Sequence, residues 1–245
     1  VALVTGAGSG LGRQFALTLA EAGASVALAA RRREKLKETA ALIEEAGGKA
    51  ICTDLDVTDP LMVTSCVREV QSELGTPDIL VNNAGIARQA FLKDISEEDW
   101  DAVLDTNLKG VFLMAQATAK AMIMAEKPGS IINIASILGF GVSKALGSYI
   151  AAKSGVIQLT KAMALEWMRN GIRVNALAPG YFVTEINEAA FEQGAHEMVK
   201  KNVPMARVGV MGEISGPLLL LASDAGSYMT GSIITVDGGH LIKSL

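Results

Sequence analysis

The sequence has few cysteines, few aromatic residues and no long hydrophobic run. Its 245 residues include two cysteines, Cys52 and Cys66, which are too distant for a CxxC pair and too few for a disulfide scaffold. The longest apolar stretches, such as residues 217–222, are far shorter than the ~20 residues that a membrane-spanning helix needs. We therefore expect a reducing, cytoplasmic setting and no membrane partner. The sequence begins at Val1, without a methionine and already inside a predicted strand, so the removal of a short leader stays open.

The sequence also has no large excess of positive or negative charge. The sequence has 22 lysines and arginines against 26 aspartates and glutamates, for a net charge of -4, and no long run of like charge. This is unlike the charged surfaces that bind nucleic acids or membranes, so we expect no nucleic-acid partner. The two histidines, His196 and His240, stand in no metal-ligand spacing, and we expect no metal site.

What the sequence does contain is 25 glycines, many small apolar residues and a regular alternation of two patterns. Short apolar runs predict seven strands, at residues 1–5, 25–29, 50–53, 78–81, 131–135, 173–177 and 232–236. Amphipathic stretches predict helices at residues 11–22, 33–46, 59–74, 107–125, 148–169 and 212–223, with one more after a capping box at 96–99. Asp59 before Pro60 is a typical helix start.

Alternation of this kind is typical of a parallel sheet, because right-handed crossovers place helices on both of its faces. We therefore predict the α/β class, with a single Rossmann-like, doubly wound domain over residues 1–245 and a seven-stranded parallel sheet with helices on both faces. Residues 185–205 interrupt the alternation. They could cover a ligand site beyond the carboxyl ends of the strands, or form a surface excursion.

A glycine-rich turn joins the first strand to the first helix. It reads Thr5-Gly-Ala-Gly-Ser-Gly-Leu-Gly12, at the place where a helix N-terminus can hold a pyrophosphate. Gly6 permits the tight turn, Gly10 lets the backbone approach the phosphates, and Gly12 allows the helix to pack closely on the strand. We predict that these glycines bind a dinucleotide cofactor together with Ser9 and Leu11. The spacing is G-x3-G-x-G rather than the usual fingerprint, so the turn alone is weak evidence.

The end of the second strand predicts which dinucleotide is used. NAD enzymes place an acidic residue here to bind the ribose 2'-hydroxyl, whereas this sequence has Ala30 followed by Arg31. A guanidinium binds phosphate in bidentate fashion, so Arg31 favours the 2'-phosphate of NADP. The alternative is that Arg31 is simply a solvent-exposed residue at the start of a helix. Because Ser9 stands where many NADP enzymes have a basic residue, use of NAD stays open.

Two further strand ends are predicted to contact the cofactor. Asp56 and Val57 follow the third strand, and Asn83, Ala84 and Gly85 follow the fourth. Both lie at the edge of the sheet where an adenine and a ribose would bind, although each could be a simple turn.

Four polar residues are candidates for the catalytic groups. Tyr149 and Lys153 are four residues apart on one face of a predicted helix, Ser136 follows the fifth strand, and Asn107 lies near the start of another helix. With these motifs the whole chain resembles the classical short-chain dehydrogenases/reductases. The resemblance rests on T-G-x3-G-x-G, N-N-A-G, S-x12-Y-x3-K, Pro179-Gly180 and the closing V-D-G-G at 236–239.

The resemblance implies a role for each of these residues. Tyr149 would act as the general acid/base, with Lys153 stabilising its phenolate and holding the nicotinamide ribose. Ser136 would orient the substrate carbonyl, and Asn107 would hold a water of a proton relay. Pro179, Gly180 and Thr184 match the family segment that contacts the nicotinamide carboxamide.

We accordingly expect an oxidoreductase that transfers a hydride between NADP(H) and a ketone/secondary alcohol pair. The alternatives are a 3-oxoacyl thioester reductase acting on acyl-carrier protein and a non-catalytic NADP-sensing protein. An epimerase or dehydratase of the extended branch is set aside, because those chains carry a further substrate domain that we do not expect here. The substrate is expected to contact Ser136, Leu138, Tyr149 and Tyr181, within an apolar wall that also includes Ile137, Phe140, Val142, Leu146 and Phe182. Family members are commonly homotetramers, and residues 114–124 and 150–168 are rich in the small and apolar residues that such contacts use.

Overall fold

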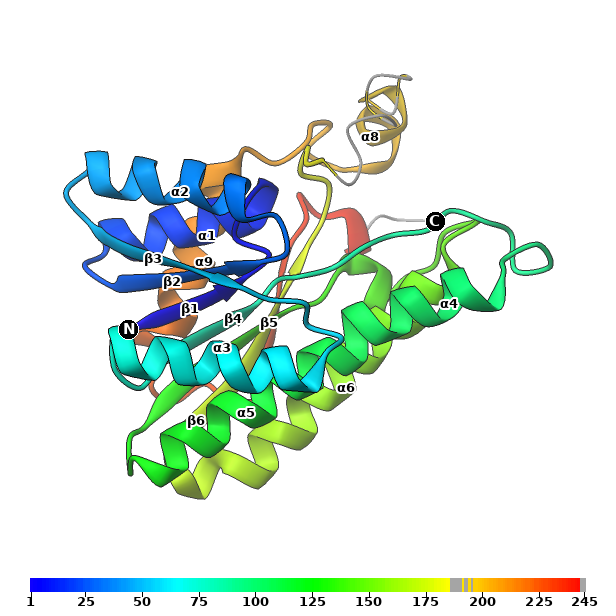
Figure 1. The fold of residues 1–245 in the computed structure, drawn as a ribbon. Helices are drawn as coiled ribbons and strands as arrows, with labels where there is room; N and C mark the ends of the chain where they lie inside the picture. The colour runs from blue at the N-terminus through cyan, green and yellow to red at the C-terminus, as the bar shows by residue number, and fades with distance from the viewer. Residues whose placement is uncertain (186–190, 192–193, 195, 243–245) are drawn as a thin grey trace.

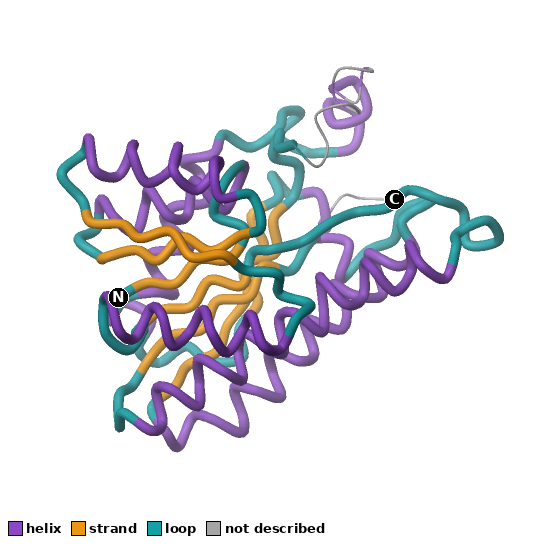
Figure 2. Tube along the Cα trace, in the orientation of Figure 1, coloured by secondary structure: helices purple, strands orange, loops and turns teal. Residues whose placement is uncertain are grey.

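Seven parallel strands form one sheet at the centre of the molecule (Figures 1 and 2). The computed structural model describes residues 1–185, 191, 194 and 196–242. In space the strands follow the order β3-β2-β1-β4-β5-β6-β7, and every neighbouring pair is parallel. The strands are β1 (Ala2–Thr5), β2 (Ser25–Ala30), β3 (Lys49–Asp54), β4 (Ile79–Asn82), β5 (Gly129–Ile134), β6 (Ile172–Pro179) and β7 (Ile233–Val236). The predicted seven-stranded parallel α/β fold is confirmed.

Helices cover both faces of the sheet, and a separate apolar core lies under each layer (Figure 2). One layer consists of α1 (Gly10–Glu21), α2 (Arg33–Glu45) and α9 (Ser215–Ala222). The other consists of α3 (Pro60–Glu73), α5 (Gly110–Met124) and α6 (Gly147–Trp167). The shorter α4 (Glu97–Leu104) packs against α6, and α8 (His196–Asn202) lies at one end of the molecule (Figure 1). The inner strands of the sheet are largely buried on both faces, as a doubly wound sheet requires, whereas the edge strands β3 and β7 are partly exposed.

Two helix starts form as the sequence predicts. The Asp59 carboxylate accepts hydrogen bonds from the backbone N–H groups of Leu61 and Met62, and Pro60 occupies the first turn of α3. The Ser96 hydroxyl accepts a hydrogen bond from the Asp99 N–H at the start of α4. Both contacts satisfy amide groups that have no partner within the helix.

The segment between α4 and α5 differs from the prediction. The sequence suggested a separate helix starting at residue 107, whereas α4 continues through a π-helical turn, Asp105–Lys109, directly into α5. At the end of this turn the helix presses on the loop after β3, since a Cβ at Gly110 would lie 2.7 Å from Val57 Cγ2. Turns of this kind are rare and concentrate at functional sites, and this one carries Asn107.

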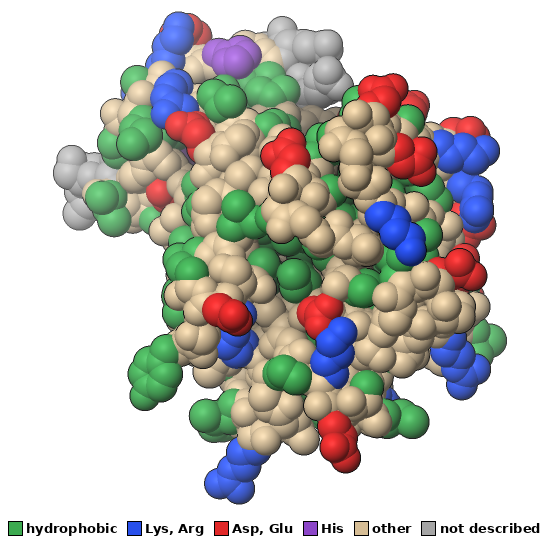
Figure 3. Space-filling model, turned by 90° about the vertical axis from the view of Figure 1, so that its left-hand side faces the viewer, with side chains coloured by type: hydrophobic (Ala, Val, Ile, Leu, Met, Phe, Trp, Pro, Cys, Tyr) green, Lys and Arg blue, Asp and Glu red, His purple; other side chains and the backbone are tan. Residues whose placement is uncertain are grey.

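The surface carries mixed charge. In the view of Figure 3, lysines and arginines are interspersed with aspartates and glutamates. No helix within the described ranges is long and apolar enough to cross a membrane. The segment predicted to cover the site, residues 185–205, contains α8; residues 186–190, 192, 193 and 195 of it lie outside the described residues.

Candidate active site

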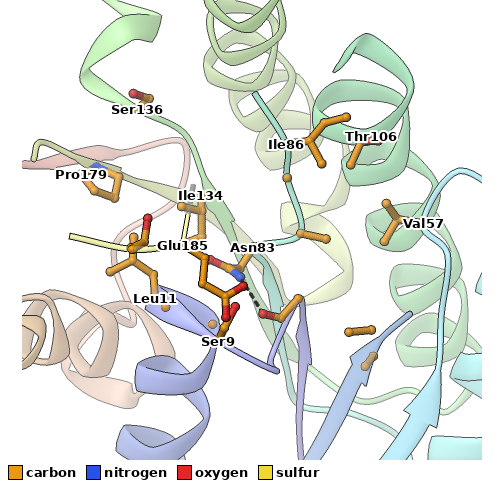
Figure 4. A pocket seen from close by; sticks show the side chains of 18 of the residues that line it. Ser9, Leu11, Val57, Asn83, Ile86, Thr106, Ile134, Ser136, Pro179 and Glu185 are labelled. Carbon is orange, nitrogen blue, oxygen red and sulfur yellow. Dashed lines mark hydrogen bonds between the residues drawn. The ribbon is translucent and has the colours of Figure 1, made fainter. Parts of the chain in front are cut away.

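A cavity of about 300 Å³ opens beyond the carboxyl ends of the parallel strands. Ligands of open α/β sheets bind at this edge, where the order of the strands reverses. Every residue predicted to contact the cofactor lines the cavity: Gly6, Ser9, Gly10, Leu11, Gly12, Arg31, Asp56, Val57, Asn83, Ala84, Gly85, Tyr149, Lys153, Pro179, Gly180 and Thr184. Figure 4 shows how side chains from the ends of several strands converge there. The structure thus brings together residues that are far apart in the sequence.

Gly6, Gly10 and Gly12 of the glycine turn stand at positions that other residues cannot readily occupy. Gly6 and Gly10 have φ angles of +66° and +50°, in the left-handed region that favours glycine. A Cβ at Gly12 would lie 2.1 Å from the Gly6 carbonyl oxygen. The turn is also tied to the end of β4, because Thr5 Oγ1 accepts hydrogen bonds of 3.0 Å from the Asn83 and Ala84 N–H groups.

The start of α1 fits an anionic ligand. Ser9 is the N-cap residue, but its side chain does not cap the helix, and the first turn contains no acidic residue. This turn lines the cavity, the Ser9 side chain does not satisfy its amide groups, and the helix dipole adds partial positive charge. Together with the close approach that Gly10 permits, this donor set fits the pyrophosphate of a dinucleotide.

The two arginines that follow β2, Arg31 and Arg32, contact different residues. Arg31 Nη1 lies 3.9 Å from Asp56 Oδ2, and its side chain is 68% exposed. Arg32 Nη2 donates to Glu185 Oε2 at 2.7 Å and to Ser9 Oγ at 3.3 Å. Both arginines line the cavity, and so does Glu185. Neither Arg32 nor Glu185 was predicted to be a site residue; the only sequence signal was that Arg32 stands in a run of three arginines.

Tyr149, Lys153 and Ser136 meet at the other end of the cavity. Lys153 is 4% exposed; its Nζ donates to the Ile134 carbonyl oxygen at 2.6 Å and lies 5.6 Å from the centre of the Tyr149 ring. Burial lowers the pKa of Lys153 to about 8. Burial also raises the pKa of Tyr149, against the opposing effect of its hydrogen bond with Ser136. At neutral pH the tyrosine is therefore a protonated phenol, able to donate its proton beside a cation.

Asn107 lies behind the cavity wall rather than in it. It is fully buried, and its side-chain amide both donates to the Ile86 carbonyl oxygen and accepts from the Ile86 N–H, each at 2.8 Å. Ile86 lines the cavity, as does Thr106 beside Asn107. These two bonds hold Ile86 in its place at the cavity wall.

Two of the residues predicted to contact the substrate do not line the 300 Å³ cavity. Leu138 does not line the cavity; its N–H bonds to Ser136 Oγ at 3.1 Å, which starts a 3-10 turn, Ile137–Gly139, directly after β5. Tyr181 is also outside, because it lies between Gly180 and Phe182, which do line the cavity, and successive residues of an extended chain face opposite sides. Tyr181 instead lines a second cavity of about 290 Å³, beside Asp237.

The predicted apolar wall does not form as a unit either. Phe140 and Val142 are exposed and Ile137 is buried, while Phe182 lines both cavities. Among the described residues no group of three or more histidine, cysteine, aspartate or glutamate side chains is arranged to hold a metal ion.

Known proteins resemble this chain over nearly its whole length. A family model described as enoyl-(acyl carrier protein) reductase matches residues 6–240. A solved short-chain type dehydrogenase/reductase from Mycobacterium marinum superimposes with a TM-score of 0.94 at 43% identity, over 98% of this chain and 94% of that one. The chain belongs to the short-chain dehydrogenase/reductase family.

Two other members of the family differ in the substrates that their names state. The 3-oxoacyl-(acyl-carrier-protein) reductase FabG of Thermotoga maritima is 41% identical over 99% of this chain and 98% of its own. A gluconate 5-dehydrogenase from Burkholderia cenocepacia, solved in complex with NADP and tartrate, is 39% identical with a TM-score of 0.95, over 99% of this chain and 95% of that one. The family is therefore shown, while these relatives act on different kinds of carbonyl compound.

Proposed function

We propose that this short-chain dehydrogenase/reductase interconverts a ketone and a secondary alcohol with NADP(H). The observation that carries the proposal is that Tyr149, Lys153 and Ser136 meet at one end of a cavity whose other end is the glycine turn and the arginines after β2. NADP in the related gluconate 5-dehydrogenase supports the choice of cofactor.

Each part of the cavity has a proposed role in holding the dinucleotide. The pyrophosphate would bind the turn between Gly6 and Gly12, and the adenosine would lie near Asp56 and Val57. Asn83, Ala84 and Gly85 would follow the cofactor toward its nicotinamide end, where Pro179, Gly180 and Thr184 would contact the carboxamide. When bound, the cofactor supplies or accepts the hydride.

The side chains of the chain itself supply orientation and the proton. Ser136 would hold the substrate oxygen beside Tyr149, and the phenol would donate its proton to that oxygen during reduction. The buried Lys153 ammonium stabilises the phenolate that remains, and it would also hold the nicotinamide ribose. Asn107 would hold a water that continues the proton relay.

The testing experiment is a comparison of initial rates with NADPH and NADH across β-keto esters, 3-oxoacyl thioesters, cyclic ketones and sugar acids. We expect turnover of at least one carbonyl class and a preference for NADPH. A preference for NADH would contradict the proposed cofactor while leaving the catalytic residues in place. Cofactor binding without turnover of any class would favour the NADP-sensing alternative.

A 3-oxoacyl thioester is the second candidate substrate, because FabG is 41% identical over almost the whole chain. Polyol acids are favoured to a similar degree by the gluconate 5-dehydrogenase. The same panel separates them, since only a thioester reductase should prefer the pantetheine-linked substrate over its simple keto ester.

We also propose a homotetramer and a cytoplasmic location. Large apolar side chains remain exposed on the two helices that family members commonly use for assembly: Phe112, Ile123 and Met124 on α5, Leu165 on α6 and Met168 just after it. Burying them against copies of the chain would remove apolar surface from water. Light scattering at micromolar concentration should give four times the mass of the 25.6 kDa chain, and a monomer would contradict the proposal.

A further inference from the structure

Three separate segments meet at the mouth of the cofactor cavity. Arg32, the N-cap residue of α2, donates to Glu185 at 2.7 Å and to Ser9 at 3.3 Å. Ser9 is the N-cap residue of α1, and Glu185 follows the end of β6 by several residues. Figure 4 shows Ser9 and Glu185 next to one another in the cavity. The chain thus places its own carboxylate at the point where the glycine turn enters the helix.

The surroundings of Glu185 are those of a bound anion. Its hydrogen bond with Arg32 lowers the pKa of the carboxyl, partial burial opposes this effect, and the Arg32 charge, the Ser9 hydroxyl and the Lys35 charge lower it further. Lys35 lies beside the turn, since a Cβ at Gly8 would be 2.8 Å from Lys35 Cβ. The Lys35 ammonium itself is paired with Glu38 at 3.0 Å, so it contributes only charge at longer range. A guanidinium and a hydroxyl are also groups that proteins use to bind phosphate.

The neighbouring arginines make different contacts. Arg31 is turned toward Asp56, at 3.9 Å, and Arg33 forms an ion pair of 2.9 Å with Asp54. Within the part of the chain that the structure describes, Arg32 is the arginine of this run that reaches the glycine turn. The residue that the sequence analysis selected, Arg31, therefore lies one position before the side chain that reaches Ser9.

We propose that Glu185 is an internal anion that occupies a phosphate anchor formed by Arg32 and Ser9. A dinucleotide with a 2'-phosphate then binds by exchanging Arg32 from Glu185 to that phosphate. This inference rests on the proposed use of NADP(H). It makes Glu185 a specificity-determining residue that lowers the affinity for any 2'-phosphorylated cofactor, and Arg32 the residue that recognises the phosphate.

Transfer of Arg32 from Glu185 to the cofactor is favourable for a 2'-phosphate but not for the ribose hydroxyl of NADH. A phosphate monoester carries more charge than a carboxylate and offers three oxygens, so it competes well for the guanidinium. The Glu185 side chain is 45% exposed, so after release it regains water, and an exposed ion pair of this kind is weak. The ribose hydroxyl of NADH is neutral and gains no comparable contact from Arg32, so NADH leaves the ion pair in place.

The test compares two probes that differ only in the 2'-phosphate: adenosine 2',5'-bisphosphate and 5'-AMP, titrated by calorimetry at low salt. Glu185→Gln should tighten the bisphosphate by about two- to fivefold, the factor that an exposed ion pair contributes. Arg32→Gln should weaken it by about tenfold, the effect of losing one charge-assisted contact. Neither variant should change the affinity for 5'-AMP by as much as about twofold. The matched control Arg33→Gln, in the same run but paired with Asp54, should change neither.

Three results would overturn the inference. One is a Glu185→Gln variant that binds the bisphosphate no more tightly than the wild type; another is an Arg32→Gln variant with unchanged affinity. The third is an Arg31→Gln variant that loses more affinity than Arg32→Gln, which would return the anchor to Arg31. A wild type that binds the bisphosphate no better than 5'-AMP would instead refute the proposed use of NADP(H), and with it the role of Glu185.

Discussion

Replacing the buried Lys153 with methionine should make the protein more stable at neutral pH while removing its catalytic ammonium. Lys153 is 4% exposed, and burial lowers its pKa from 10.5 to about 8. Each pKa unit corresponds to about 1.4 kcal/mol, so holding the charged form in the folded state costs about 3 kcal/mol. Methionine removes this cost but loses the 2.6 Å hydrogen bond to the Ile134 carbonyl oxygen, which contributes about 1 kcal/mol. The variant should therefore be more stable by about 2 kcal/mol at pH 7.

The pH dependence of this difference has a definite sign. Between about pH 8 and 10.5 the unfolded lysine still binds the proton that the folded lysine has released, so the wild type gains stability as the pH rises. Below about pH 8 both states are protonated and the full cost is present. Tyr149 acts in the opposite direction at higher pH, because its folded pKa is raised above 10.0. The comparison is therefore confined to pH values below about 9.5, where the wild type should recover about 2 kcal/mol relative to Lys153→Met.

The assay is urea unfolding of both proteins at several pH values, followed by far-UV circular dichroism. Taking the difference between the two free energies of unfolding cancels groups that titrate in both proteins, including the thiols of Cys52 and Cys66. Lys161→Met, which changes an exposed lysine on the same helix, is the matched control and should leave the pH slope unchanged. If the difference between wild type and Lys153→Met were the same at pH 7 and at about 9.5, the buried charge would not have the cost assigned to it.

Three further predictions follow from the geometry. Tyr149→Phe should reduce turnover by about 10²- to 10⁴-fold, the contribution of a positioned proton donor, and leave NADPH affinity in a fluorescence titration nearly unchanged; normal turnover would exclude the tyrosine as the acid. Gly12→Ala should destabilise the protein by about 1–3 kcal/mol and weaken cofactor binding, because the new Cβ would lie 2.1 Å from a carbonyl oxygen. Its control, Gly216→Ala in α9, meets nothing within 4 Å and should be neutral or slightly stabilising in the same thermal melt. Asn107→Ala leaves the N–H and carbonyl of the partly buried Ile86 without their side-chain partner and should cost about 1–3 kcal/mol in urea unfolding; a loss of activity without this destabilisation would contradict a positioning role.

Much of the fold could be predicted because its signals are local. The start of α3 at Asp59 and Pro60, and of α4 at Ser96, depends on side chains and amides two or three residues apart. The apolar runs of the inner strands likewise reflect burial on both faces of a doubly wound sheet. The π-helical turn at Asp105–Lys109 escaped prediction, since its extra residue is accommodated by the packing of Gly110 on Val57 and by the bonds of Asn107 to Ile86.

The candidate site, like the fold, depends partly on local sequence and partly on tertiary structure. The sequence alone determined which groups the site contains: the glycines whose conformations other residues cannot adopt, and Ser136, Tyr149 and Lys153 in the spacing of a known family. Only the tertiary structure decided which of the neighbouring candidates face the cavity. Tyr181 and Leu138 lie outside it, and Arg32 rather than Arg31 reaches Ser9.

The pairing of Arg32 with Glu185 shows why the sequence alone could not predict every contact of the site. These two residues are 153 positions apart, so no periodicity or local motif connects them. Their contact exists because β2 and β6, although separated in the sheet, end at the same edge, and the loops that follow them turn toward the same helix N-terminus. Local sequence determines which conformations a segment can adopt, whereas the direction of an exposed side chain depends on what the rest of the chain places beside it.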